Sequence, residues 1–306
     1  MKALCIGRSA YHFQIEVDDF VQLNQKKESS EFLESSSGSI VNAARVLGKF
    51  GVETYVGSVV GDDTFGNIIK KDLEKVGVHT EFMETAFEKR TTITTKTTKK
   101  ATNESQGYIC SKEKLVLKKS DFPMQPDLIY IDGYDYGASL SALNQYSGAI
   151  SVLNTKSSSN EVYELSKYCK YIIATREFAE WVTGMKVDLE NSNALVAMYS
   201  TLLNKFIGKS VIITLGNKGT LYVVNGQIKV MPSLSVKEVD NEGAGDIFGG
   251  AFAYSLLQGY DLEKAITFAN IAGGLSVSKT PVRDSVPDLS EIMEYFNQKY
   301  PSGGNS

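Results

Sequence analysis

Short apolar, β-branched runs alternate with stretches of helical spacing along most of the chain, and this alternation constrains the fold more than any other feature. Six runs have the character of buried strands: "ALCIG", "ETYVGSVV", "DLIYIDG", "AISVL", "YIIA" and "SVIITLG". Strands that alternate with helices in this way form a parallel sheet with helices on both faces. The sequence therefore predicts an α/β fold, a three-layer α/β/α sandwich around a mostly parallel central sheet.

Three of the helical stretches end at or just before a glycine. Residues 42–50 precede Gly51, residues 64–76 precede Gly77, and residues 191–206 end close to Gly208. Glycine takes the left-handed conformation at a helix end without steric cost. These glycines therefore predict where the three helices stop.

Two regions break the alternation, at about residues 11–36 and 90–112. In the second, "RTTITTKTTKK" alternates threonine with apolar or basic residues at a period of two, which is typical of a strand with one solvated face. We expect both regions to form a small β-sheet lid on a single domain that spans residues 1–306. Because such a lid leaves an open edge and an apolar face, we also expect it to pair with a second copy in a homodimer.

Charge and cysteine usage exclude several classes of partner. The 306 residues carry a formal net charge of −4, so no basic field exists for nucleic acid or an anionic membrane. No apolar run approaches the ~20 residues needed to cross a bilayer. Three widely spaced cysteines without a CxxC pair argue against disulfides and a zinc site, and they favour the reducing cytoplasm.

A glycine-rich loop, "DNEGAGDIFGG" (residues 240–250), stands directly before an apolar stretch of helical spacing. A helix N-terminus presents unpaired N–H groups, so Gly243, Ala244 and Gly245 can direct amides at one oxyanion. Asp246 is then either a helix cap or a base that takes the proton from a hydroxyl attacking a phosphate. No Lys-Ser or Lys-Thr follows the glycines, so the loop is not a P-loop.

Two further loops follow the pattern of ligand sites. "TLGNKG" (residues 214–219) comes after an apolar strand, and its glycines let the backbone approach a phosphate or a flat base, although a plain hairpin turn is the simpler interpretation of this motif alone. Gly38 and Asn42 bracket a helix start that faces the predicted lid. The Asn42 amide either binds a hydroxyl-rich ligand or caps that helix.

Taken in order, five motifs resemble those of the ribokinase-like, or PfkB, carbohydrate kinases over nearly the whole chain. They are "GSIVNAARVLGKFG", "VGSVVGDDTFGNIIKKDLEKVGV", "VIITLGNKG", "VDNEGAGDIFGGAFAYSLL" and "FANIAGGLSVS". The resemblance implies a ribokinase-like sandwich with a β lid that closes over a sugar. It also implies phosphorylation of a sugar hydroxyl with ATP and Mg2+.

The resemblance further implies roles for single residues. Asp246 would be the catalytic base, with Gly243, Ala244 and Gly245 as the anion hole. The residues implied to bind ATP are Thr214, Gly216, Asn217, Gly219 and Asn270. Those implied to contact the sugar are His12, Gly38, Asn42 and Asp246. Where some members bind K+, this chain has Asp240, Glu242 and Ser285.

Several positions depart from the family pattern. His12 stands where the family has an aspartate that binds sugar hydroxyls, and Ser37 replaces the first of two glycines. The family's Asn-x-x-Glu sequence, which organises Mg2+ and phosphate, is replaced by Thr175 to Phe178, and Glu177 is displaced by one position, ~100° around a helix. Two alternatives to a sugar kinase therefore stay open: a weakened or non-catalytic binding or regulatory protein with this fold, and a nucleoside kinase.

Overall fold

A ten-stranded sheet forms the middle layer of the computed structural model, which describes residues 1–29, 32–102, 104–279 and 284–300. Its strand order is β14-β13-β12-β11-β10-β9-β1-β4-β5, and β6 pairs with β4. Neighbouring strands run parallel except at β12–β13 and β13–β14. The strands are β1 (Lys2–Ile6), β4 (Glu53–Gly61), β5 (Val78–His79), β6 (Met83–Ala86), β9 (Leu128–Ile131), β10 (Ile150–Asn154), β11 (Tyr171–Thr175), β12 (Ser210–Thr214), β13 (Thr220–Val224) and β14 (Gln227–Met231).

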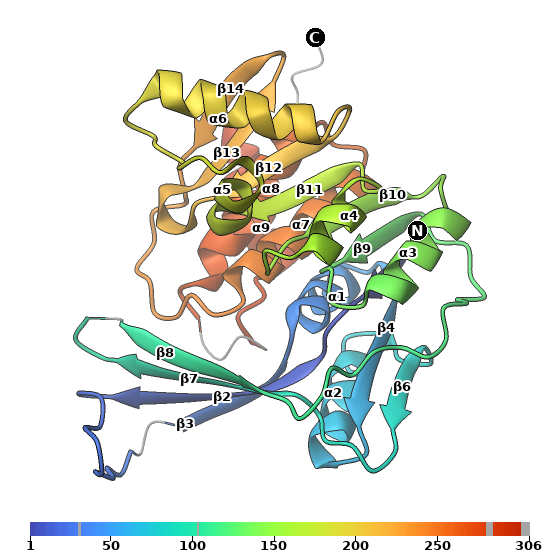
Figure 1. Cartoon of the computed structure of the whole chain (residues 1–306), viewed down its shortest axis with the longest axis vertical. Helices are drawn as coiled ribbons and strands as arrows, with labels where there is room; N and C mark the ends of the chain where they lie inside the picture. The colour runs from blue at the N-terminus through green and yellow to red at the C-terminus, as the bar shows by residue number, and fades with distance from the viewer. Residues whose placement is uncertain (30–31, 103, 280–283, 301–306) are drawn as a thin grey trace.

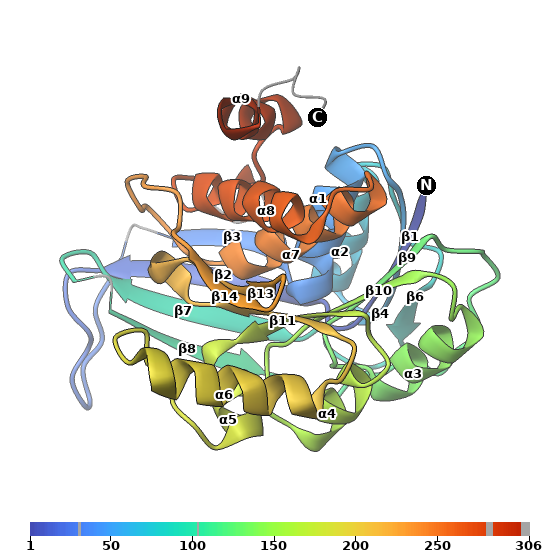
Figure 2. The same cartoon turned by 90° about the horizontal axis from the view of Figure 1, so that it is seen from above.

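Helices cover both faces of this sheet, as Figure 2 shows. One face carries α1 (Ser39–Lys49), α2 (Thr64–Glu74), α7 (Ala244–Leu257), α8 (Leu262–Ser276) and α9 (Leu289–Lys299). The other face carries α3 (Tyr136–Gln145), α4 (Asn160–Ser166), α5 (Arg176–Thr183) and α6 (Ser192–Lys205). The predicted three-layer sandwich is confirmed.

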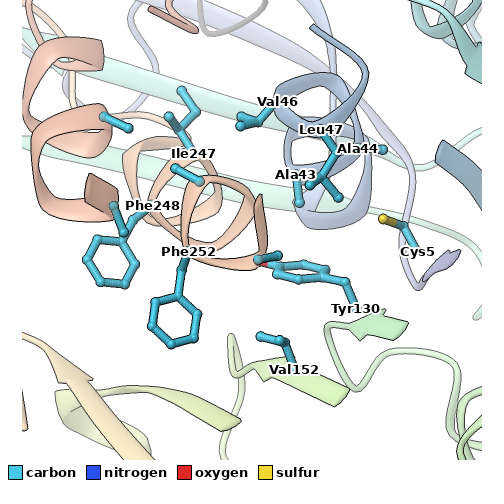
Figure 3. Close-up of a cluster of buried hydrophobic side chains, with 14 of the residues drawn as sticks. Cys5, Ala43, Ala44, Val46, Leu47, Tyr130, Val152, Ile247, Phe248 and Phe252 are labelled. Atoms are coloured by element: carbon cyan, nitrogen blue, oxygen red, sulfur yellow. The ribbon is translucent and has the colours of Figure 1, made fainter. Parts of the chain in front are cut away.

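Alternate side chains of the central strands enter two separate hydrophobic cores. In β1, Ala3 and Cys5 pack on the side of α1 and α7, whereas Leu4 and Ile6 pack on the side of α3. Figure 3 shows the first core, where side chains of β1, β9 and β10 meet those of α1 and α7. Burial on both faces explains why the strands are continuous apolar runs.

A second, four-stranded sheet stands away from the sandwich (Figure 1). Its order is β3-β2-β7-β8, and its strands are β2 (Ala10–Val17), β3 (Phe32–Ser37), β7 (Ile93–Lys99) and β8 (Ser105–Cys110). The ring of Tyr11 stacks on Phe65 of α2 at 4.6 Å, which anchors the sheet to the sandwich. These strands fall, to within one residue at each end, in the two regions predicted to form the lid.

The six predicted strands are all present, as β1, β4, β9, β10, β11 and β12. The "TLGNKG" segment is a hairpin turn, with the 3-10 helix η1 (Gly216–Lys218) between antiparallel β12 and β13. The left-handed Gly51, Gly77 and Gly208 follow α1, α2 and α6 as expected. Every helix among the described residues falls short of the length and apolarity that crossing a membrane requires. That residues 1–306 form a single domain stays a prediction.

Candidate active site

Asp246 lies in the first turn of α7 and receives three hydrogen bonds or ion-pair contacts from other elements. Ser39 Oγ donates to Oδ1 at 2.7 Å, Asn42 Nδ2 donates to Oδ2 at 3.0 Å, and Lys156 Nζ lies 2.8 Å from Oδ1. The residue that caps α7 is Gly243, and it makes no side-chain cap bond. Asp246 is therefore not a helix cap, and its carboxylate faces α1 and the loop after β10.

The ionised form of Asp246 is stabilised despite its burial. Burial raises the pKa of Asp246, but Lys156, Asn42 and Ser39 together lower it by more, so the net pKa lies below the usual value. Lys156 shows the reciprocal effect, because its pKa is lowered by burial and raised further by Asp246. Both groups are thus charged at neutral pH.

The loop before α7 brings a backbone turn and a cation together. Gly243 has a left-handed φ of 73°, and the Ala244 N–H makes a long 3.3 Å bond to the Asn241 carbonyl. A Cβ on Gly245 would lie 3.4 Å from Lys156 Nζ. An oxyanion seated on this turn would therefore meet the Lys156 ammonium as well as the helix N-terminus.

A cavity of about 860 Å³ opens beside this turn. Ala244 and Gly245 line one part of it. The five residues predicted to bind ATP line it too: Thr214, Gly216, Asn217, Gly219 and Asn270. Asn270 is held by the Pro232 carbonyl, which accepts from its Nδ2 at 2.5 Å. The turn before α7 and the residues predicted to bind ATP therefore line one cavity, which is large enough for a nucleotide.

Gly38 and Asn42 lie where the sequence placed them, at the start of α1. Gly38 has a φ of 108°, and a Cβ there would stand 2.5 Å from the Arg8 carbonyl, so a larger residue would not fit. The Asn42 amide donates to Asp246, and its Oδ1 accepts from Arg45 Nη1 at 3.0 Å. Asn42 is thus a partner of the carboxylate, and the helix-cap alternative is wrong.

His12 lies on the lid strand β2 and is almost fully buried. Its Nδ1 is 2.9 Å from Thr94 Oγ1, while its Nε2 is buried without a hydrogen-bond partner. Burial lowers the pKa of His12, so the ring is neutral at pH 7. A neutral imidazole can donate or accept one bond to a sugar hydroxyl, but it cannot replace an aspartate that accepts two.

A second carboxylate, Asp132, follows β9 beside Asp246. It accepts from the backbone N–H of Arg8 at 2.9 Å and of Tyr134 at 2.9 Å. Burial raises the pKa of Asp132 to about 6, and the nearby Asp246 adds to the effect. Two neighbouring carboxylates thus have opposite pKa shifts: both are mostly ionised at pH 7, and Asp246 keeps its charge to lower pH than Asp132 does.

Two of the three predicted K+ residues, Asp240 and Glu242, lie beside an ammonium. Lys96 of β7 donates to Asp240 Oδ1 at 3.1 Å and to Asn241 Oδ1 at 3.1 Å, and its Nζ lies 3.7 Å from Glu242 Oε2. Ser285 is buried. Because Lys96 already supplies a positive charge to Asp240 and Glu242, these side chains do not fit a K+ site, and we derive no step through K+.

The positions that replace the family's Asn-x-x-Glu sequence have structural roles. Thr175 caps α5, accepting from the Phe178 N–H at 3.2 Å, and Phe178 is fully buried with its ring stacked near Phe206. Glu177 is exposed in the first turn of α5. These residues therefore do not supply the family's magnesium-organising pair.

Sequence reasoning missed Ser39, Lys156, Asp132 and Arg8. Lys156 and Asp132 follow strands that the sequence predicted, β10 and β9, so their place at the carboxyl edge of the sheet was open to inference. Ser39 stands next to the predicted Gly38. The positions of Ser39 and Lys156 in the sequence do not show that their side chains reach Asp246.

Taken together, the site has a buried ionised carboxylate, a cation and a helix N-terminus beside a nucleotide-sized cavity, and this arrangement can transfer a phosphoryl group to a hydroxyl. The model of the pfkB family carbohydrate kinases matches residues 1–289. The chain therefore belongs to the pfkB family of carbohydrate kinases.

Individual relatives and solved structures agree with this family. The chain is 26% identical over 313 residues to a ribokinase of Bacillus subtilis, covering 97% of this chain and 100% of the relative. The structure of Arabidopsis thaliana ribokinase complexed with ribose and ATP matches with a TM-score of 0.81 at 17% identity, over 96% of this chain and 98% of that one. Ribokinase from Cryptococcus neoformans in complex with ADP matches with a TM-score of 0.80 at 20% identity, over 96% and 98%. These likenesses confirm the ribokinase-like fold.

Proposed function

We propose that this kinase transfers the γ-phosphate of ATP, bound as its magnesium complex, to a hydroxyl of a sugar or sugar-like acceptor, with Asp246 as the base. The observation that carries the proposal is the position of Asp246. It is buried at the N-terminus of α7, next to the residues that line the nucleotide-sized cavity. The neighbouring Arabidopsis structure, with ribose and ATP, supports the two substrates.

In the proposed reaction, the acceptor hydroxyl approaches Asp246 from the side of α1. The carboxylate takes the hydroxyl proton while the acceptor oxygen forms a bond to the γ-phosphorus. The bond from that phosphorus to the bridging oxygen breaks, and ADP leaves with the electron pair. Gly243, Ala244 and Gly245 lie where the charge of the transferred group develops.

Lys156 links the base to the phosphoryl group. Its side chain is 38% exposed, so it has room to move from Asp246 toward an anion on the Gly245 turn. A phosphate that attracts the ammonium would remove the main charge that depresses the pKa of Asp246. The base would then become stronger when ATP is in place.

Magnesium accompanies ATP as part of the substrate in this proposal. Because Phe178 fills the family's glutamate position, protein groups contribute less to holding the metal than in other members. We expect a higher requirement for free Mg2+ as a consequence.

Association and location are part of the same proposal. β8 is an edge strand of the lid with Tyr108 and Ile109 largely exposed, and pairing of two lids would cover it. We propose a homodimer that works in the cytoplasm on small molecules.

A coupled ADP-release assay over sugars, sugar acids, sugar phosphates and nucleosides tests the function. Phosphorylation of at least one acceptor by the parent enzyme, and its loss in Asp246→Asn, is the expected result. ATP binding in calorimetry without turnover of any acceptor would instead support the non-catalytic alternative.

A further inference from the structure

The backbone of Arg8 contacts residues that neighbour the proposed base. It follows β1, its backbone N–H donates to Asp132 Oδ2 at 2.9 Å, and its carbonyl packs against Gly38. Gly38 directly precedes Ser39, which donates to Asp246. The Arg8 backbone is thus fixed between Asp132 and the residues that hold the proposed base.

The guanidinium of Arg8 makes no hydrogen bond to the described residues. Its Cζ lies 5.5 Å from the centre of the Tyr134 ring, and its Nε is buried without a hydrogen bond. Arginine is always charged, and buried polar groups are normally hydrogen-bonded. The Arg8 guanidinium, stacked on the Tyr134 ring with its Nε–H unused, can therefore donate hydrogen bonds to a ligand.

A second cation contacts the same ring. Lys114 Nζ lies 5.2 Å from the centre of Tyr134, and it pairs with Glu161 at 3.1 Å. Lys114 is therefore held in an ion pair, whereas the Arg8 guanidinium makes none among the described residues and is balanced only at longer range by Asp132, whose pKa it lowers.

The predicted nucleotide site does not include the Arg8 guanidinium. The cavity lined by the predicted ATP residues lies between the β12–β13 turn, part of residues 232–245, and helices α7 and α8. Neither Arg8 nor Tyr134 lines this cavity. Lys156, in contrast, reaches the Gly245 turn directly. The Arg8 guanidinium therefore lies outside the lining of the cavity that the predicted ATP residues share.

We propose, on the basis of the function proposed above, that the acceptor carries an anionic group, a carboxylate or a phosphate, which Arg8 binds. The planar guanidinium presents paired N–H donors that match two oxygens of such a group, a geometry that a sugar hydroxyl does not provide. The acceptor class is thus a sugar acid or a sugar phosphate.

The test compares an aldose, its aldonic acid and its terminal phosphate in the ADP-release assay. The enzymes are the parent, Arg8→Gln and, as control, Lys167→Gln, which removes an exposed cation stacked on the Tyr163 ring. We expect the parent to prefer one anionic member, and Arg8→Gln to raise the KM for that member ~10–100-fold with kcat within a few-fold, because one charge-assisted contact is lost. Which anionic member responds distinguishes the carboxylate from the phosphate.

Two results would overturn the proposal: preference of the parent for the neutral aldose, or an equal loss of kcat with every acceptor in Arg8→Gln, which would place Arg8 on the transferred phosphate. If the parent phosphorylates nothing, the proposed function fails, and calorimetry with the aldonic acid and the sugar phosphate decides the role of Arg8. Binding that is lost in Arg8→Gln but kept in Lys167→Gln supports the anion site. Equal affinity of all three proteins, or no binding to any, rejects it.

Discussion

The ammonium of Lys156 lies 2.8 Å from Oδ1 of Asp246, so the carboxylate proposed as base is held in an ion pair. A paired carboxylate with a depressed pKa is a weak base. The same ammonium borders the turn that would hold the transferred phosphate. The pair therefore connects nucleotide binding to the strength of the base.

Asp246→Asn should abolish phosphoryl transfer and leave ATP affinity within a few-fold of the parent. Asparagine has the same size and can still accept from Ser39, yet it cannot take a proton at neutral pH. A general base contributes ~10²–10⁴-fold, and the loss of kcat should fall in that range or beyond. Steady-state kinetics and ATP calorimetry measure the two quantities. Activity within tenfold of the parent would show that Asp246 is not the base.

Lys156→Met should lower kcat by about 10²-fold, as expected when one group that stabilises a transferred oxyanion is lost. It should also move the acid limb of the profile of kcat/KM for ATP to higher pH, because this ratio reports the enzyme before ATP draws Lys156 away from Asp246. Burial raises the pKa of Asp246 and Lys156 opposes this, so removal of Lys156 lets the pKa rise. Lys167→Met, which removes an exposed lysine paired with Glu164, is the matched control. An unchanged acid limb would mean that Lys156 does not set the ionisation of the base.

The sequence predicted the backbone of this site better than its side-chain contacts. Strand and loop order follow from local patterns, and Asp246, Asn42 and Gly38 stand in motifs a few residues long. The partners Ser39 and Lys156 depend on how α1 and the loop after β10 pack against α7, which no local pattern reports. The structure excludes the helix-cap interpretation of Asp246, and its role as the base stays a prediction.

The departures from the family pattern were visible in the sequence, but their consequences were not. Phe178 was expected to remove a magnesium-organising glutamate, and the structure adds that the ring has joined the core on the far face. Asp240 and Glu242 suggested a K+ site because they stand where some family members bind this ion. The ammonium of Lys96 comes from the lid, distant in the sequence, and only the folded chain brings it there.

Asp132 should make the fold less stable as pH rises. Its folded pKa is raised to about 6, against an unfolded value of about 3.9. Between these values the folded state keeps a proton that the unfolded state has lost, so stability falls from about pH 4 to 6 and stays lower above, by roughly 3 kcal/mol. In urea titrations at pH 5 and pH 8, Asp132→Asn should show a smaller difference in unfolding free energy than the parent. Equal differences would contradict the raised pKa.

Ile109→Asp should prevent dimer formation without unfolding the monomer. Ile109 is 60% exposed on the edge strand β8, so it contributes little to the core, and a charge there would be buried if two lids paired. Sedimentation velocity at micromolar concentration should show a dimer for the parent and a monomer for the variant. Glu104, exposed just before β8, offers a control in Glu104→Gln. A monomeric parent would contradict the proposed association.

Lys96→Met should make the enzyme responsive to K+, whereas the parent should be insensitive to it. In the parent, the ammonium lies within 3.1 Å of Asp240 Oδ1, and the Glu242 N–H donates to the same carboxylate oxygen, so the lid residue helps to hold the loop that leads into the anion hole. Methionine keeps the length and apolar stem of the side chain but removes the charge, and we expect kcat to fall roughly tenfold as the loop loses its fixed geometry. Addition of K+ to the variant should restore part of the rate, because a small cation can then approach Asp240 and Glu242. Initial rates of both proteins, with K+ exchanged for tetramethylammonium at constant ionic strength, measure this. Strong activation of the parent by K+ would show that Lys96 does not supply the charge, and the K+ prediction at Asp240, Glu242 and Ser285 would then stand.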